Sequence, residues 1–124
     1  MLEAFGGSGE LRGGRDNDLI ELYDGTSFMA NGNKGSDTLI NYGGDNTLHG
    51  GQDNDILASF GGVSTMYGDK GSDTFVFYED GFGLIIDFQN GVDQLNFANL
   101  SNVSLSTNSE GTEVINNGAV IGFI

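Results

Sequence analysis

Aspartates that close glycine-rich turns are the side chains of this sequence best suited to chemistry. Four such turns occur, and each is followed by a short apolar segment. Because glycine tolerates positive φ and close approach, these turns can point several backbone carbonyl groups into one concavity. Carbonyl oxygens joined by a carboxylate form the ligand set that a hard divalent cation requires. The four closing aspartates are Asp18, Asp37, Asp55 and Asp73.

A single turn has too few oxygens for a complete cation site. Ca²⁺ takes about six to eight oxygen ligands in flexible geometry, so two stacked turns have to share each ion. Such a cage suits Mg²⁺ poorly. Four turns leave three gaps between neighbours, which predicts about three to four Ca²⁺ ions. Beside the aspartates, the predicted ligands are turn residues that offer mainly carbonyl groups: Gly13, Arg15, Asp16, Gly32, Lys34, Gly35, Gly50, Gln52, Asp53, Gly68, Lys70 and Gly71.

Three further aspartates have a less regular place in this pattern. Asp16 and Asp53 stand where the other two turns have glycine. Aspartate tolerates left-handed backbone geometry better than most residues, so the turn conformation is expected to survive there. Asp87 follows the last repeat. It is predicted either to complete a terminal Ca²⁺ site or to be a plain surface carboxylate.

The spacing of apolar residues places the turns on a repeating framework. Successive centres are nine residues apart, with a single gap of ten between Met29 and Leu39. A fixed short period of turn plus strand is typical of a solenoid. These centres are Leu2, Leu11, Ile20, Met29, Leu39, Leu48, Leu57, Met66, Phe75 and Leu84.

Aromatic residues show that the true repeat is eighteen residues, with two strands and two turns in each coil. Stacked coils form parallel strands about 4.8 Å apart, with the apolar centres facing inward between two sheets. All aspartate turns then lie on one flank and all short turns on the other, which predicts a single row of ions. The extra residue of one coil is expected as a bulge between Tyr23 and Gly32. The aromatic residues, expected to stack along one edge, are Phe5, Tyr23, Tyr42, Phe60 and Tyr78.

The fold class expected is therefore all-β. Residues 1–77 are predicted to form a right-handed parallel β-roll of about four to five 18-residue coils. Residues 78–124 are predicted to form a small antiparallel β cap on the same domain. Asn90 and Gly91 are a strong hairpin signal within it. The strands expected in the cap are 84–88, 92–97, 103–107, 112–116 and 119–124.

Composition excludes several classes of partner. The 124 residues carry a formal net charge of −14 with only 4 Lys and Arg, which argues against nucleic acid and anionic membrane surfaces. No apolar run approaches the roughly 20 residues of a membrane span, and no cleavable N-terminal signal is expected. The absence of cysteine excludes disulfides and thiolate metal sites.

The same charge makes the cation important for folding. Carboxylates stacked one coil apart lie roughly 5 Å from each other, and they repel by about 1 kcal/mol per pair in water and about 3 kcal/mol at an effective dielectric constant of 20. Several such pairs compare with a typical domain stability of about 5–15 kcal/mol. We therefore expect the roll to be largely unfolded without Ca²⁺ and to fold on binding it.

The turns resemble the hemolysin-type Ca²⁺-binding repeats of the RTX (repeats-in-toxin) family, most clearly at residues 68–76. The similarity covers about residues 5–77, and residues 73–95 are similar to the closing segment of that family. The resemblance implies a parallel β-roll whose turn carbonyls and aspartates are the Ca²⁺ ligands. It also implies an extracellular protein, secreted by type I machinery with an uncleaved C-terminal signal, that folds outside the cell.

Three functions remain open besides a non-catalytic calcium-binding module. The first is an accessory module for an acidic polysaccharide, as in some alginate-modifying enzymes of similar sequence; binding would run through Ca²⁺ because basic residues are few. The second is a hydrolase using the single histidine, His49, which is expected beside a short turn facing solvent with no Ser or Cys to activate. The third is an adhesin or surface element that self-associates through the uncapped N-terminal end, where Leu2 already follows the period.

Overall fold

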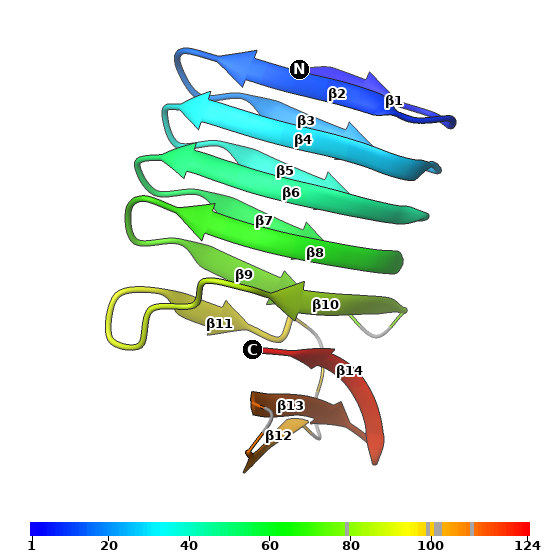
Figure 1. Ribbon diagram of the computed structural model, residues 1–124, viewed down its shortest axis with the longest axis vertical. Helices are drawn as coiled ribbons and strands as arrows, with labels where there is room; N and C mark the ends of the chain where they lie inside the picture. Colours follow the sequence, from blue (N-terminus) through cyan, green and yellow to red (C-terminus); the bar gives the residue numbers. More distant parts are fainter. Residues whose placement is uncertain (79, 99, 101–102, 110) are drawn as a thin grey trace.

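The computed structural model describes residues 1–124 except 79, 99, 101–102 and 110. Its described part contains strands and turns and no helix. The strands form two sheets that lie face to face, with successive coils stacked along the long axis of the molecule (Figure 1). The expected parallel β-solenoid, predicted with about four to five coils, is confirmed with about five, and an antiparallel part closes it. Parallel pairing continues beyond residue 77, through residues 81–85 and 94–96, which were expected in the cap.

The chain alternates between the two sheets. Sheet A contains β1 (Leu2–Ala4), β3 (Leu19–Leu22), β5 (Thr38–Asn41), β7 (Ile56–Ser59), β9 (Thr74–Phe77) and β11 (Gln94–Asn96), in that order. Sheet B contains β2 (Gly9–Gly14), β4 (Thr26–Lys34), β6 (Asp45–Gln52), β8 (Gly62–Asp69), β10 (Gly81–Ile85), β14 (Ala119–Phe123), β13 (Gly111–Asn116) and β12 (Val103–Asn108). Pairing is parallel from β1 through β11. β14 continues sheet B by pairing parallel with β10, and β13 and β12 add to it antiparallel.

Inward side chains of the two sheets form a thin core of stacked apolar residues. In sheet A, each core residue pairs in register with its equivalent in the next coil, and the same holds in sheet B. All of them are at most 2% exposed. They are Ile20, Leu39, Leu57 and Phe75 from sheet A, and Ala30, Leu48, Met66 and Ile85 from sheet B.

The prediction that Met29 and Leu84 lie in the core is wrong. Met29 is 43% exposed, and Ala30 takes the buried place, because the register of β4 shifts between Thr26 and Met29. This is the expected bulge; the Phe28 N–H there donates to the Asn46 side chain at 2.9 Å. Leu84 is only half-buried and its neighbour Ile85 fills the core, since β10 is offset from β8 by 19 residues rather than 18.

The flank of the short turns is held by stacked rings and buried amides. The predicted aromatic ladder is confirmed, with ring centroids 3.5–5.0 Å apart from Phe5 to Tyr78. Just inside it, the fully buried Asn41 side chain donates to the Ser64 hydroxyl and accepts from the Asn46 amide, both at 2.9 Å. These bonds satisfy polar groups that would otherwise be costly to bury.

The predicted hairpin at Asn90 and Gly91 is wrong. The strands on either side of it lie in different sheets, β10 against β8 and β11 against β9. The segment is instead one more connection between the sheets on the aspartate flank (Figure 1). No helix within the described residues is long and apolar enough to cross a membrane.

Candidate metal centre

The closing aspartates form a ladder along one flank of the roll. Each stands directly before a strand of sheet A, so the in-register stacking of β3, β5, β7 and β9 aligns them. One carboxylate oxygen, Oδ1, accepts the backbone N–H of the aspartate one coil earlier. The N–H of Asp18 donates to Asp37 at 2.7 Å, that of Asp37 to Asp55 at 2.8 Å and that of Asp55 to Asp73 at 2.9 Å.

The second carboxylate oxygens of three ladder residues lack partners. Oδ2 of Asp18, Asp37 and Asp55 is buried without a hydrogen bond. Among the described residues, ion pairs join Arg12 to Glu10 and His49 to Asp69, and neither involves the ladder. A buried carboxylate oxygen without a donor or a cation is expensive, so three equivalent ones in a row mark a place where a bound cation or a proton would stabilise the fold.

These unpartnered oxygens lie beside carbonyl oxygens of the following coil. A methyl group added to Gly13, Gly32 or Gly50 would fall against Oδ2 of the aspartate that closes the same turn. The same added atom would lie 2.7–2.9 Å from a glycine carbonyl oxygen one coil further on. Those carbonyls belong to Gly32, Gly50 and Gly68. Only glycine leaves this space open, so each gap brings together oxygens from two neighbouring turns.

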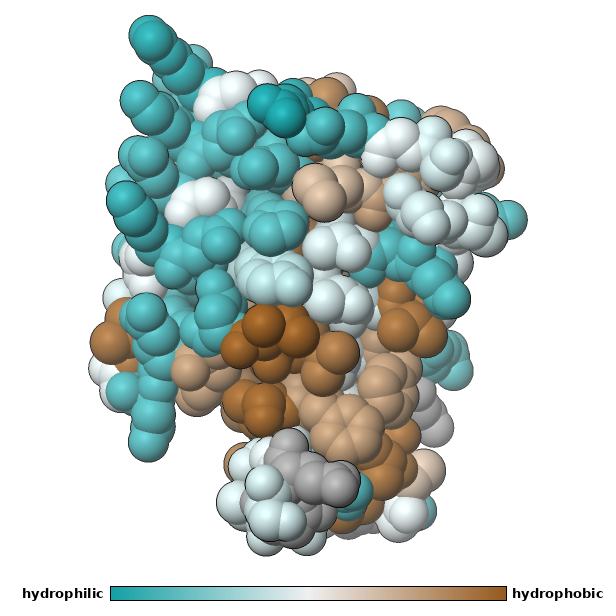
Figure 2. All heavy atoms as spheres, in the orientation of Figure 1, coloured by the Kyte–Doolittle hydropathy of each residue, from teal (hydrophilic) through white to brown (hydrophobic). Residues whose placement is uncertain are grey.

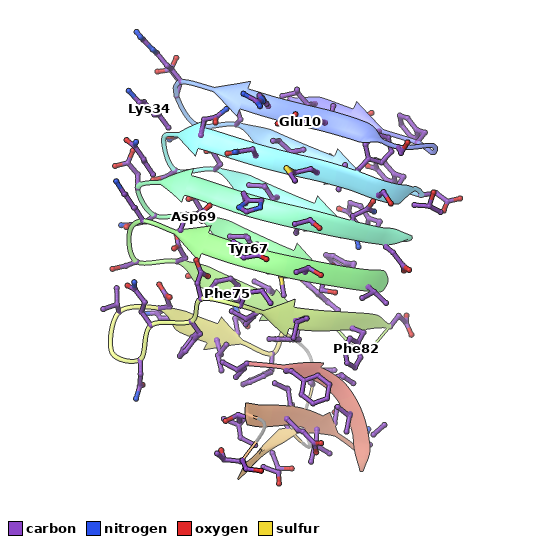
Figure 3. The ribbon with its side chains drawn as sticks, viewed as in Figure 1. Glu10, Lys34, Tyr67, Asp69, Phe75 and Phe82 are labelled. Atoms are coloured by element: carbon purple, nitrogen blue, oxygen red, sulfur yellow. The ribbon has the colours of Figure 1, made fainter. Side chains whose placement is uncertain are left out.

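The remaining turn residues either contact the next turn through their backbone or lie exposed at the tip of the turn. Asp16 and Asp53 have φ of 74° and 78°, which confirms the expected left-handed geometry. Their backbone carbonyls lie against Gly35 and Gly71 of the next turn of the same type. The residues at the tips of the turns, Arg15, Lys34, Gln52 and Lys70, are exposed, and Figure 3 shows Lys34 extending from the flank.

Asparagines in these turns were not predicted to matter. The side-chain oxygens of Asn17 and Asn54 accept the backbone N–H of Ser36 and Ser72, each at 2.8 Å. Asp53 similarly accepts from the Gly35 N–H at 3.1 Å. The turns are therefore linked from coil to coil by side chains as well as by the sheet.

Asp93 is a fifth member of the ladder that the sequence pattern did not reveal. Its Oδ1 accepts the N–H of Asp73 at 2.9 Å, and its Oδ2 accepts that of Gln89 at 2.8 Å. It was missed because it lies 20 residues after Asp73 instead of 18. The signal was a further glycine, aspartate and apolar residue at Gly91, Asp93 and Leu95.

Asp87 lies on the same flank but outside the ladder. Its two oxygens accept the backbone N–H groups of Gly68 and Asp69, both at 2.8 Å. The carboxylate thus closes the last aspartate turn from the C-terminal side. A role for Asp87 in a terminal site stays a prediction.

Burial and mutual repulsion disfavour the charged forms of the ladder. Burial raises the pKa of Asp37, and it raises the pKa of Asp55 to about 7 and that of Asp73 to about 6. Neighbouring carboxylates add to each increase. These are the residues that a cation between the coils would stabilise most.

Each turn contributes one ladder carboxylate rather than a cluster of side chains. Within the part of the chain that the structure describes, no three His, Asp or Glu side chains converge as a metal-binding group. An ion in a gap would therefore take most of its ligands from backbone carbonyls. Ca²⁺ accepts such ligands readily.

His49 differs from the prediction. It stands at the aspartate-turn end of β6, directly before Gly50, rather than beside a short turn. Its ring stacks on Tyr67 with centroids 4.4 Å apart, and Nδ1 lies 3.2 Å from Oδ2 of Asp69. The imidazole is thus held by Tyr67 and Asp69 of β8, which are labelled in Figure 3.

Comparison with known proteins adds no further assignment. No protein-family model, curated protein or solved structure matched the chain. The function therefore has to be inferred from the aspartate flank itself.

Proposed function

We propose that this chain is a non-catalytic calcium-binding β-roll module of the RTX type. Ca²⁺ ions would lie in one row between the stacked aspartate turns. The observation that carries the proposal is the set of buried Oδ2 atoms of Asp18, Asp37 and Asp55, which have no partner and lie beside carbonyls of the next coil. A divalent cation would satisfy both kinds of oxygen at once.

Calcium binding would also be coupled to folding. The hydrophilic surface of the aspartate flank (Figure 2) and the formal net charge of −14 favour an extended chain when no cation is present. Ions bound only by stacked turns stabilise the stacked state by the full free energy of binding. Extracellular modules bind Ca²⁺ at about 10⁻⁴–10⁻³ M, so folding would be confined to the outside of the cell. Secretion by type I machinery is part of the same proposal.

Isothermal titration calorimetry tests the site directly. We expect the chain to bind about three Ca²⁺ ions or more and to bind Mg²⁺ much more weakly. Asp55→Asn should weaken binding roughly tenfold, or about 1.4 kcal/mol, because the Asp55 turn lies between two gaps. Asp24→Asn is the matched control, since Asp24 is an exposed aspartate at a short turn. Equal calcium binding by both variants would contradict the proposal.

A second function, binding of an acidic polysaccharide, is favoured by the placement of positive charge. All four basic residues of the chain, Arg12, Arg15, Lys34 and Lys70, lie in the aspartate turns or within three residues of one. With Ca²⁺ in the gaps, this flank would be the least negative surface of the molecule. Binding of a polyuronate in calcium, lost in chelator and lost in Lys34→Glu, would support this function; binding that survives chelation would refute the route through Ca²⁺.

A further inference from the structure

One edge of sheet B is left open for pairing. β12 ends the eight-stranded order, and its pairing in the described residues is with β13 alone. In Figure 1, β12 lies at the end of the molecule remote from the N-terminus. An edge strand of six residues presents a row of backbone N–H and C=O groups that another strand can pair with.

The other three sheet edges carry features that oppose pairing. β1 and β11 have three residues each, and Glu3 lies exposed in β1. β2 carries Glu10 and Arg12. Short length and charge are the usual means by which proteins protect edges. β12 has neither protection, because it is six residues long and its sequence, Val-Ser-Leu-Ser-Thr-Asn, includes no charge. It contains no proline either.

The core-facing side of β12 is also incompletely covered. Leu105 pairs in register with Val114, which is fully buried, and it lies on the same face of the strand as Val103, which packs against the core. Leu105 is nevertheless 51% exposed, because the sheet ends there. A strand added to this edge would cover it.

We propose that β12 pairs antiparallel with β12 of a second copy of this chain, joining the two B sheets into one. The strand is self-complementary about a two-fold axis at Leu105. The two Leu105 side chains would then meet, Val103 would face Thr107 of the second copy, and Ser104 would face Ser106 of the second copy. No charged pair arises, and apolar residues oppose apolar or methyl-bearing ones.

The size of this contact sets its strength. One strand pair buries less than the roughly 1,200 Å² of a stable interface, so the dimer should be weak, on the order of micromolar or weaker. The net charge of −14 on each copy opposes association at low salt. Salt near 0.15 M screens charges beyond about 8 Å and should therefore strengthen the dimer.

Sedimentation of the full chain over a concentration series, in calcium and 0.15 M salt, tests the dimer. Wild type should show a concentration-dependent dimer, and Leu105→Lys should weaken it at least tenfold. Val63→Lys is the matched control, because Val63 is 40% exposed but lies in β8, which is paired on both sides. Circular dichroism should confirm that both variants fold.

Cross-linking tests the register independently. The chain has no cysteine, so Leu105→Cys introduces a single thiol, and opposed residues of antiparallel strands have Cβ atoms about 4.5–5.5 Å apart. Oxidation with diamide should then convert the Leu105→Cys variant to a disulfide-linked dimer much faster than it converts the Val63→Cys variant. A monomer at all concentrations, a dimer unaffected by Leu105→Lys, or equal cross-linking of the two cysteine variants would each overturn the proposal.

Discussion

The carboxyl groups of the aspartate ladder determine how the calcium-free roll should respond to pH. Burial raises the pKa of Asp55 from its ordinary value of 3.8 to about 7 in the folded chain. A carboxyl whose pKa is raised by folding stabilises the fold when protonated, and that contribution is lost as pH rises through the folded pKa. The difference for Asp55 alone corresponds to roughly 4 kcal/mol.

The stability of the calcium-free chain should therefore fall between about pH 4 and pH 8. Asp73, with a pKa of about 6, and Asp37, with a raised pKa, act in the same direction. Because the calcium-free chain is expected to be largely unfolded near neutral pH, far-UV circular dichroism in chelator at pH 5 and pH 8 measures the effect; the β-sheet signal should be larger at pH 5, and Asp55→Asn should make the dependence shallower. Stability that increases from pH 5 to pH 8 would show that the ladder is not under charge repulsion.

Individual residues also show which parts of the candidate site and of the core could be predicted from the sequence. Ladder positions Asp18 to Asp73 were predictable because each closes a turn of constant length. Asp93 was not predictable in this way, because it lies 20 residues after Asp73 and therefore does not fit an 18-residue period. Met29 was assigned to the core because the bulge was placed only approximately, and a shift of one residue moves a side chain to the other face of a strand.

The short turns depend on close backbone contact between neighbouring coils. Gly44 has φ of 77°, and a methyl group added to it would fall on the carbonyl oxygen of Gly25 in the preceding coil. The turns can stack at sheet spacing only if no side chain intervenes there. This explains Gly44, and Gly62 in the next coil, without any role in metal binding.

We expect Gly44→Ala to destabilise the calcium-loaded roll strongly. The matched control is Gly118→Ala, because Gly118 has φ of 80° but nothing within 4 Å of an added methyl group. Both variants incur the left-handed penalty of about 1–2 kcal/mol. Gly44→Ala should cost at least about 2 kcal/mol more, from overlap with the packed backbone. Similar midpoints of urea unfolding for the two variants would contradict this packing.

The loop at Asn90 and Gly91 shows why the tail was harder to predict than the repeats. Asn-Gly favours a tight turn, and Gly91 does have φ of 83°. The dipeptide does not specify whether the next strand returns in the same sheet or crosses to the other one. Here the crossing is decided by pairing of β11 with β9, a contact between segments about 20 residues apart.

Considered as a whole, the molecule combines a thin core with a large negative charge. The core is a single layer of side chains between two sheets, and the formal net charge is −14. Acids on the aspartate flank are stacked in register, so their repulsion acts along the axis on which the coils associate. Ions between the coils would turn that repulsion into attraction.

Far-UV circular dichroism during titration with calcium, followed by chelator, tests this coupling most directly. We predict a disordered spectrum in chelator, a β-sheet spectrum at millimolar Ca²⁺, reversal on chelation and little change with Mg²⁺. The same β-sheet spectrum in chelator as in calcium would contradict calcium-dependent folding.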